Sequence, residues 1–217
     1  MTSPANTPET ARLALAQYLS PAFPVGGFAW SQGLECAMDQ GLATRATLAD
    51  WLTDWLGHGA GRTDAVLLAL SLRPGADHAA LDDLARAACL SSQRLSETVE
   101  QGTAFASNVA ALTGMAQPAA ALPVAVGRAC AAMPLPPPEI VAAFLQAQAA
   151  GLVSAAVRFL PLGPVEGQAM LAALQPAILA VAKQAATATE ADLFSATWGA
   201  DIAAMRHETM PVRIFRS

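Results

Sequence analysis

Apolar residues recur along this chain with the spacing of helices rather than of strands. Between residues 47 and 58, for example, five of them fall on one helical face: Leu48, Trp51, Leu52, Trp55 and Leu56. Segments that alternate between apolar and polar positions, as half-buried strands do, are short, and runs of β-branched residues are missing. The pattern therefore predicts an all-α protein.

Prolines, glycines and capping residues divide this pattern into a single-domain helical bundle of about eight to ten helices. Thr7 followed by Pro8 is a typical helix start, and Pro21 requires that helix to end near Ser20. Because no Ser/Gly-rich linker divides the chain, residues 1–217 are expected to form one domain, with a mobile N-terminal segment 1–8. The later expected helices include 64–72, 78–95, 96–112, 124–133, 139–160 and 165–186.

The segment 20–35, with the sequence SPAFPVGGFAWSQGLE, is the most distinctive part of the chain. Its two prolines and two adjacent glycines favour a tight connection between helices. From about Phe28 the spacing becomes helical, and Gly41 lies where that helix is expected to end. A phosphate-binding loop would need Lys and then Ser or Thr after its second glycine, where Phe28 and Ala29 stand instead. Composition alone favours a rigid connector.

The apolar stripe of that expected helix assigns a direction to its side chains. Trp30, Leu34 and Met38 recur every four residues and are expected to face the core. Four polar residues fall off the stripe and are expected to face solvent: Ser31, Gln32, Glu35 and Asp39. A carboxylate on an exposed face makes a poor general acid, and the Ser31 hydroxyl has no histidine within sequence reach.

Composition limits the classes of protein to which the chain can belong. Of its 217 residues, 54% are hydrophobic and 13% are charged, the net charge is −5, and the mean hydropathy is +0.38. A nucleic-acid-binding protein needs a basic face, which this charge balance disfavours. The apolar excess instead indicates either membrane spans or surfaces that partners bury.

The uncharged run 140–157 is the best candidate for a membrane span. It holds two glutamines and a serine, and much of the rest is alanine, whereas a span needs about 20 strongly apolar residues. A buried core helix is therefore the better interpretation. No cationic, apolar signal segment opens the chain, so the sequence predicts a cytoplasmic protein without a membrane segment.

The polar residues form no recognisable metal or catalytic motif. Asp50, Asp54 and His58 lie in a line along one helix, which indicates a solvated face rather than a metal site. His207 and Glu208 lack the second histidine of the zinc-protease motif. Three widely spaced cysteines are expected to be free thiols: Cys36, Cys89 and Cys130. We therefore expect no catalytic residue, metal or cofactor.

The last residues of the chain combine apolar and cationic side chains. Arginine beside exposed apolar groups is typical of an interface anchor. Two alternatives stay open, namely docking on a partner protein and docking on the chain's own domain. The residues concerned follow Pro211: Val212, Arg213, Ile214, Phe215 and Arg216.

Three motifs give the chain a resemblance to a known family. They are SPAFPVGGFAWSQGLE at 20–35, AVRFLPLG at 156–163, and IAAMRHET at 202–209 followed by RIFRS at 213–217. Together they resemble the UreF family of urease accessory proteins, and they span almost the whole chain. The resemblance implies an all-helical, non-enzymatic adaptor that serves nickel insertion into urease.

The same resemblance implies a homodimer that binds the accessory protein UreD (also called UreH), the GTPase UreG and apo-urease. Because the chain lacks a phosphate loop, any GTP is expected on a partner. A small metal-dependent hydrolase or a nickel-binding protein is the alternative. The motif residues become expected partner contacts, with a partner-binding tail over about 207–217: Ser31, Gln32, Glu35, Arg158, His207, Glu208, Arg213, Phe215 and Arg216.

Overall fold

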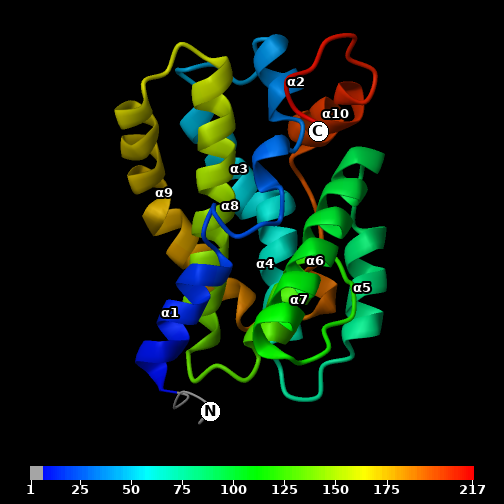
Figure 1. Cartoon of the computed structure of the whole chain (residues 1–217). Coiled ribbons are helices and arrows are strands. Elements are labelled where there is room, and N and C mark those ends of the chain that lie inside the picture. The colour runs from blue at the N-terminus through cyan, green and yellow to red at the C-terminus, as the bar shows by residue number, and fades with distance from the viewer. Residues whose placement is uncertain (1–6) are drawn as a thin grey trace.

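The computed structural model describes residues 7–217, and the regular structure within that range is entirely helical (Figure 1). The expected all-α class is therefore confirmed. Of the segment expected to be mobile, residues 1–6 lie outside the described part of the chain. The helices are α1 (Pro8–Tyr18), η1 (Gly27–Ala29), α2 (Leu34–Asp39), α3 (Leu48–His58), α4 (Ala60–Ser71), α5 (His78–Ala87), α6 (Ser92–Thr113), α7 (Leu122–Cys130), α8 (Pro137–Phe159), α9 (Pro164–Ala185), η2 (Glu190–Asp192) and α10 (Trp198–His207).

Capping side chains explain where two of these helices begin. Thr7 caps α1, since its hydroxyl accepts a hydrogen bond from the N–H of Thr10 at 3.3 Å. Ser91 caps α6, since its hydroxyl accepts from the N–H of Arg94 at 3.1 Å. The sequence predicts that this helix begins at Ser96. That prediction is wrong by about one turn, because Ser91 is the capping residue.

The segment expected to be helical from Phe28 folds differently. Only the short 3-10 helix η1 forms there, and α2 begins at Leu34. Gln32 and Gly33 have φ values of 54° and 78°, and such left-handed backbone interrupts a right-handed helix. Gly41 follows the end of α2 with a φ of 70°, as expected for a residue that terminates a helix.

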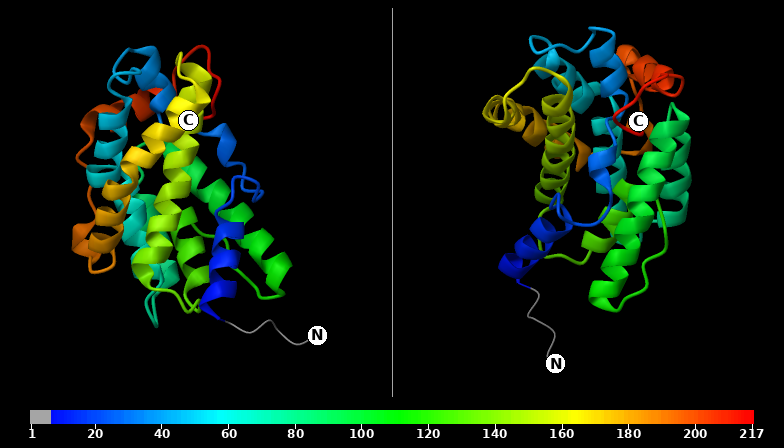
Figure 2. Two further views of the ribbon diagram at one scale, coloured as in Figure 1. Left: turned by 90° about the vertical axis from the view of Figure 1, so that its left-hand side faces the viewer. Right: turned by 45° about the horizontal axis from the view of Figure 1, so that its top comes forward.

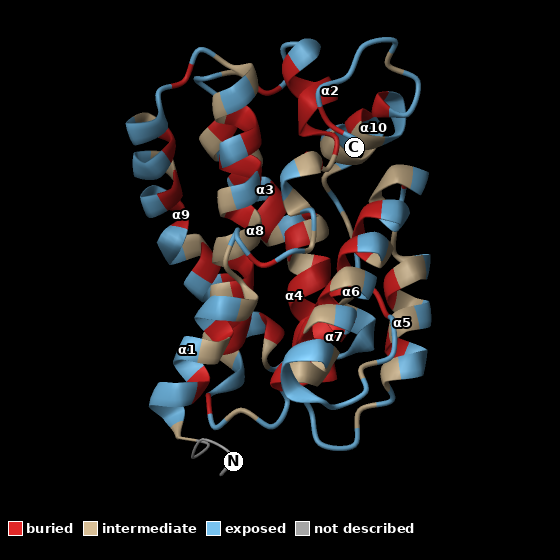
Figure 3. Cartoon of the chain, viewed as in Figure 1, coloured by how far each residue is buried: buried red, intermediate tan, exposed pale blue. Residues whose placement is uncertain are grey.

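Helix α4 lies at the centre of the bundle and packs against α3, α7, α8 and α9 (Figure 1). All of its residues from 63 to 71 are buried. Figure 3 shows buried stripes on α6 and α8 as well, with exposed residues on their outer faces. Helix α10 packs against α2 and α6, and so brings the last part of the chain beside the segment that precedes α2.

Helices α8 and α9 are long and apolar enough to cross a membrane by length and composition alone. They pack against each other, and Ile140, Phe144 and Leu145 of α8 are buried in the core. Core burial therefore accounts for the apolar run 140–157. The outer face of α9, by contrast, exposes Val165 and Leu179.

Candidate functional site

The last residues of the chain return to the segment 20–35 and bind its backbone (Figure 2). The N–H of Arg216 donates to the carbonyl oxygen of Ala29 at 2.8 Å, and the N–H of Ser31 donates to the carbonyl oxygen of Ser217 at 2.8 Å. The Ser31 hydroxyl also donates to that Ser217 oxygen. The first and last motifs of the sequence therefore form one structural unit.

Glu35 holds this unit together through a set of contacts that we call the Glu35 clasp. One of its carboxylate oxygens accepts from the N–H of Ile214 at 2.6 Å, and the other accepts from the N–H of Phe215 at 3.0 Å. The second oxygen also lies 2.8 Å from Nε2 of His207, whose Nδ1 lies 2.7 Å from Oε1 of Gln93. Both ring nitrogens of His207 thus lie within hydrogen-bonding distance of an oxygen atom, so the buried imidazole has a partner at each nitrogen.

The clasp corrects the directions expected for Ser31 and Glu35. Both were expected to face solvent, but their exposed fractions are 0% and 1%. The physical reason is that no helix runs through residue 31 and that the tail covers this face. Gln32 is half-buried, and its amide oxygen accepts from Nε1 of Trp55 at 2.9 Å. His207, the last residue of α10, also turns inward and is 0% exposed.

Phe215 packs on the chain's own domain, where its exposed fraction is 3%. The guanidinium of Arg158 lies 4.3 Å from the centroid of the Phe215 ring, a favourable cation–π distance. The same guanidinium donates to the carbonyl oxygen of Phe28 at 2.9 Å. The Phe215 ring is therefore buried by its own domain, as in the second of the two alternatives for the tail, and its contact with a partner stays a prediction.

The remaining expected contact residues lie at the surface around the clasp. Arg216 pairs with the Glu100 carboxylate at 2.6 and 2.9 Å and lies 4.3 Å from the ring centroid of Trp30. Glu208 accepts from the N–H of Ser92 at 2.7 Å, at the start of α6. Between them runs a segment that we call the surface loop, 208–214. Four successive residues in it are exposed: Pro211, Val212, Arg213 and Ile214.

Replacing Gly33 with alanine should loosen α10 and the clasp that follows it. A Cβ at Gly33 would lie 2.5 Å from Cα of Ala204 in α10, whereas a Cβ at Gly26 would meet nothing within 4 Å. Both glycines have left-handed backbone, so Gly26→Ala should cost about 1 kcal/mol in the free energy of unfolding. Gly33→Ala should cost roughly 1–3 kcal/mol more. Urea denaturation of the two variants measures the difference, and equal costs would contradict close packing of α10.

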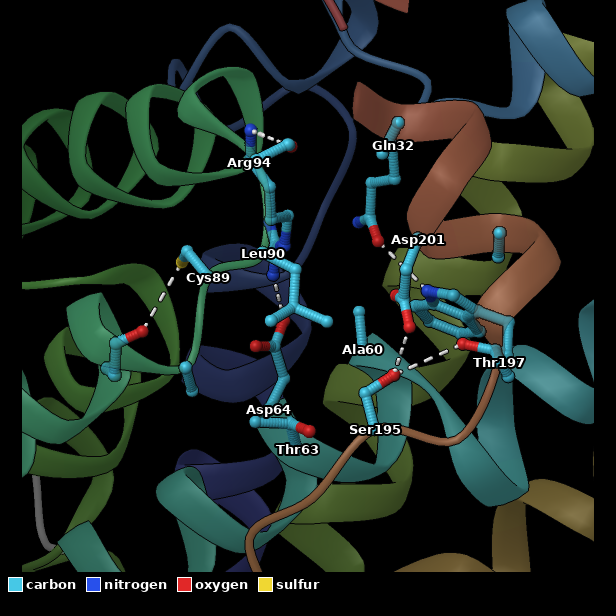
Figure 4. Close-up of a pocket in the computed structure, with 16 residues that line it drawn as sticks. Gln32, Ala60, Thr63, Asp64, Cys89, Leu90, Arg94, Ser195, Thr197 and Asp201 are labelled. Carbon is cyan, nitrogen blue, oxygen red and sulfur yellow. Dashed lines mark hydrogen bonds and ion pairs between the residues drawn. The ribbon is translucent and has the colours of Figure 1, made fainter. Parts of the chain in front are cut away.

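A second buried polar group, which includes a guanidinium, lies at the start of α6 (Figure 4). Nη2 of Arg94 donates to the Asp64 carboxylate at 2.5 Å, and Nη1 lies 3.4 Å from the Glu97 carboxylate. Burial raises the pKa of both carboxyls, although the positive charge of Arg94 opposes that shift. Asp64 and Arg94 border a cavity of about 60 Å³, and across it Asp201 accepts from the Ser195 hydroxyl at 2.8 Å.

Comparison with known proteins agrees with the motifs. A family model described as UreF matches residues 42–175. The chain belongs to the UreF family. The urease accessory protein UreF of Paracoccus denitrificans (strain Pd 1222) is 76% identical over 211 residues, which cover 97% of this chain and 98% of that relative. The protein of the same name from Cereibacter sphaeroides (strain ATCC 17023) is 55% identical over 208 residues, which cover 95% of this chain and 99% of that relative. The protein of the same name from Jannaschia sp. (strain CCS1) is 44% identical over 206 residues, which cover 94% of this chain and 94% of that relative.

No three His, Cys, Asp or Glu side chains within residues 7–217 of this UreF family member are gathered to hold a metal ion. Asp50, Asp54 and His58 lie exposed along α3. Burial raises the pKa of Cys130 to about 12 and that of Cys89 to about 11. These two thiols are therefore protonated at neutral pH, and a protonated thiol is a poor nucleophile and a poor metal ligand.

Sequence reasoning missed four residues of the two buried polar groups in this UreF family member. Asp64 gave a signal, because it stands in the otherwise apolar part of α4, where a buried carboxylate needs a partner. That partner, Arg94, lies 30 positions away, and no spacing rule locates it. Gln93 and Glu97 gave no signal, since polar residues in the first turns of a helix are usually solvated.

Proposed function

We propose that this UreF family member is a non-enzymatic cytoplasmic adaptor that joins UreD (UreH) and UreG on apo-urease and promotes nickel insertion. Its relatives carry the name urease accessory protein, which supports a role beside urease. The Glu35 clasp is the observation that carries the proposal. Its polar groups bind one another and hold the surface loop, 208–214, in place. Such an arrangement presents a surface to another protein and leaves no polar group of the clasp to act on a substrate.

The proposal assigns nucleotide chemistry to UreG. The chain lacks the sequence of a phosphate-binding loop, so it would couple or regulate the GTPase step through contact with UreG. A protein that acts only through contacts needs surface that a partner can cover. The apolar excess of this chain supports such a role.

We also propose that the chain forms a homodimer. Helix α9 supports this, because its exposed positions between Glu166 and Lys183 carry no charged side chain. Val165 and Leu179 are 83% and 63% exposed, and burial of such residues favours association.

The expected partner contacts divide into two roles under this proposal. Arg213, Glu208 and Arg216 are at the surface and would contact a partner directly. The other side chains would act indirectly, by holding the surface loop in place, and all of them are buried or half-buried except the exposed Arg158, which lies over the Phe215 ring. The residues with this indirect role are Ser31, Gln32, Glu35, Arg158, His207 and Phe215.

Replacing Arg213 with alanine should weaken capture of UreD and UreG by about tenfold and lower the yield of nickel-loaded urease. The melting temperature should stay unchanged, because an exposed arginine contributes little to folding. Co-purification from cells that express the urease operon, together with urease activity, measures both effects. Arg12→Ala is the matched control, since Arg12 is exposed and pairs with Glu139 in another part of the molecule.

Two outcomes distinguish a wrong assignment of Arg213 from a wrong proposal for the whole chain. Full capture and full activation by the Arg213→Ala chain would remove Arg213 from the partner surface and leave the adaptor role standing. Urease that acquires nickel equally well in cells lacking the whole chain would overturn the adaptor role itself.

A further inference from the structure

The segment 20–28, which we call the strap, crosses the molecule between α6 and α8 (Figure 1). The Pro24 carbonyl accepts from Nδ2 of Asn108 on α6 at 3.0 Å, and the Phe28 carbonyl accepts from Arg158 on α8 at 2.9 Å. Between these anchors the strap forms one wall of a cavity of about 330 Å³, which we call the strap cavity. Its volume lies within the usual range of small-molecule sites, roughly 300–1,000 Å³.

Most of the strap cavity is walled by aromatic and aliphatic side chains. Phe105 on α6 and Phe144 on α8 are both buried and both line it. Tyr18 packs edge-on against Phe105, with 5.7 Å between the ring centroids. Leu122, Leu152 and Trp30 add to the apolar surface. Such walls favour the hydrocarbon part of a ligand.

One wall of the strap cavity carries a carboxylate that shares its only guanidinium partner with a second carboxylate. Glu97 lines the cavity and is 2% exposed. Its guanidinium partner, Arg94, is shared with Asp64 and lies closer to it, at 2.5 Å compared with 3.4 Å for Glu97. Arg158, at the rim, is turned to the Phe28 carbonyl. This part of the interior therefore holds two carboxylates and one guanidinium. The less tightly paired carboxylate, Glu97, also accepts from the Ser217 hydroxyl at 3.4 Å and lies on the cavity side.

Gln101 adds a second acceptor beside that carboxylate. Its Nε2 donates to Glu97 at 3.2 Å, which leaves Oε1 to accept a hydrogen bond. A Cβ at Gly27 of the strap would lie 3.5 Å from this Oε1. Gly27 does not have the left-handed backbone of its neighbour Gly26, so backbone conformation alone does not demand a glycine there. The missing side chain leaves the space over Oε1 open.

We propose that the strap cavity binds an alkylammonium group. The hydrocarbon lies against the Phe105 and Phe144 rings, and the ammonium lies against the Glu97 carboxylate and Oε1 of Gln101. An ammonium group carries three donors and no acceptor, so it matches a wall of acceptors and supplies the missing positive charge. The group can come from a free alkylamine or from a lysine side chain of another protein.

Titration of the full chain with n-butylammonium, followed by two-dimensional NMR, tests this site. Saturable shifts of amides in the strap and in α6 are expected, with an affinity about tenfold or more above that for n-butanol, which has the same hydrocarbon and no charge. Glu97→Gln should lower the affinity for n-butylammonium to that for n-butanol. It should not unfold the chain, because Arg94 keeps Asp64 as its partner. Asp83→Asn is the matched control, since Asp83 is exposed and does not line the cavity.

A second variant tests the site without touching a buried charge. Gly27→Val should fill the space over Gln101 and weaken n-butylammonium binding while leaving the melting temperature unchanged. Equal affinities for n-butylammonium and n-butanol, or equal effects of Glu97→Gln and Asp83→Asn, would overturn the proposal. So would the absence of saturable shifts with n-butylammonium.

The source of the ammonium group is distinguished with Nα-acetyl-lysine methylamide. Binding of this compound, lost when its Nε is acetylated, identifies a lysine side chain of another protein as the ligand. Binding of n-butylammonium without binding of the lysine compound identifies a free alkylamine. Either result supports an alkylammonium site.

Discussion

A chain carrying Arg94→Met should lose about 3–5 kcal/mol of unfolding free energy. Arg94 is buried between two carboxylates, and its removal leaves both without a positive partner. The cost comes from the unpaired charges rather than from the lost side chain. Adding Asp64→Asn and Glu97→Gln to the same chain should therefore restore most of the stability. Urea denaturation at pH 7 measures the free energy of unfolding of the unaltered chain, the Arg94→Met chain and the triple variant.

The pH dependence of the Arg94→Met chain follows from the sign of the carboxyl shifts. Burial already raises the pKa of Asp64 and Glu97 above the ordinary values of 3.8 and 4.5, and loss of Arg94 removes the opposing charge. A carboxyl whose pKa is raised by folding favours the folded state when protonated, and that contribution is lost as pH rises. The loss of unfolding free energy caused by Arg94→Met should therefore become smaller as pH falls from 7 toward 4.5. Arg12→Met, at an exposed ion pair, should leave the free energy of unfolding nearly unchanged at every pH. An equally small effect of Arg94→Met would contradict this account.

Phe215→Ala should lower the free energy of unfolding by about 3–5 kcal/mol. The Phe215 ring is almost fully buried and is covered by the Arg158 guanidinium. An anchor that only a partner buries would leave the stability of the isolated chain unchanged, so this variant separates the two alternatives for the tail. Denaturation of the purified chain in the absence of any partner measures the effect.

The neighbouring residue provides the control for Phe215→Ala. Ile214 belongs to the same segment but is 62% exposed, so Ile214→Ala should change stability by less than about 0.5 kcal/mol. If Ile214 belongs to the partner surface, Ile214→Ala should weaken capture of a partner more than Phe215→Ala does. A stable Phe215→Ala chain would show that the tail does not contribute to the core.

The fold class was predictable because helix periodicity, prolines and caps are local signals. The first turn of α1 follows from Thr7 and Pro8 alone. The direction of Glu35 was not predictable, because it depends on the tail and on Gln32 adopting left-handed backbone. An expected helix through residues 28–40 assigns Glu35 to the outside, whereas the observed break before Leu34 turns it inward.

The candidate site shows the same division between local and distant signals. The motifs marked His207 and Phe215 as notable, but their partners are distant in sequence. His207 lies 172 positions from Glu35 and 114 positions from Gln93. Only tertiary packing brings such residues together, and no periodicity encodes it. The sequence leaves two alternatives for the tail for this reason, and burial of the Phe215 ring favours docking on the chain's own domain for that ring.

The Glu35 clasp makes completion of the fold a late event in the life of the chain. The two backbone N–H groups that bind Glu35 belong to residues 179 and 180 positions further along. At a synthesis rate of about 5–20 residues per second, they follow Glu35 by roughly 10–40 seconds. Closing so long a loop is a slow and entropically costly step. The tail therefore packs over the strap and α2 only after it has been synthesised. A nascent chain that has not reached residue 214 lacks both backbone N–H groups that bind Glu35, so water takes their place at that carboxylate.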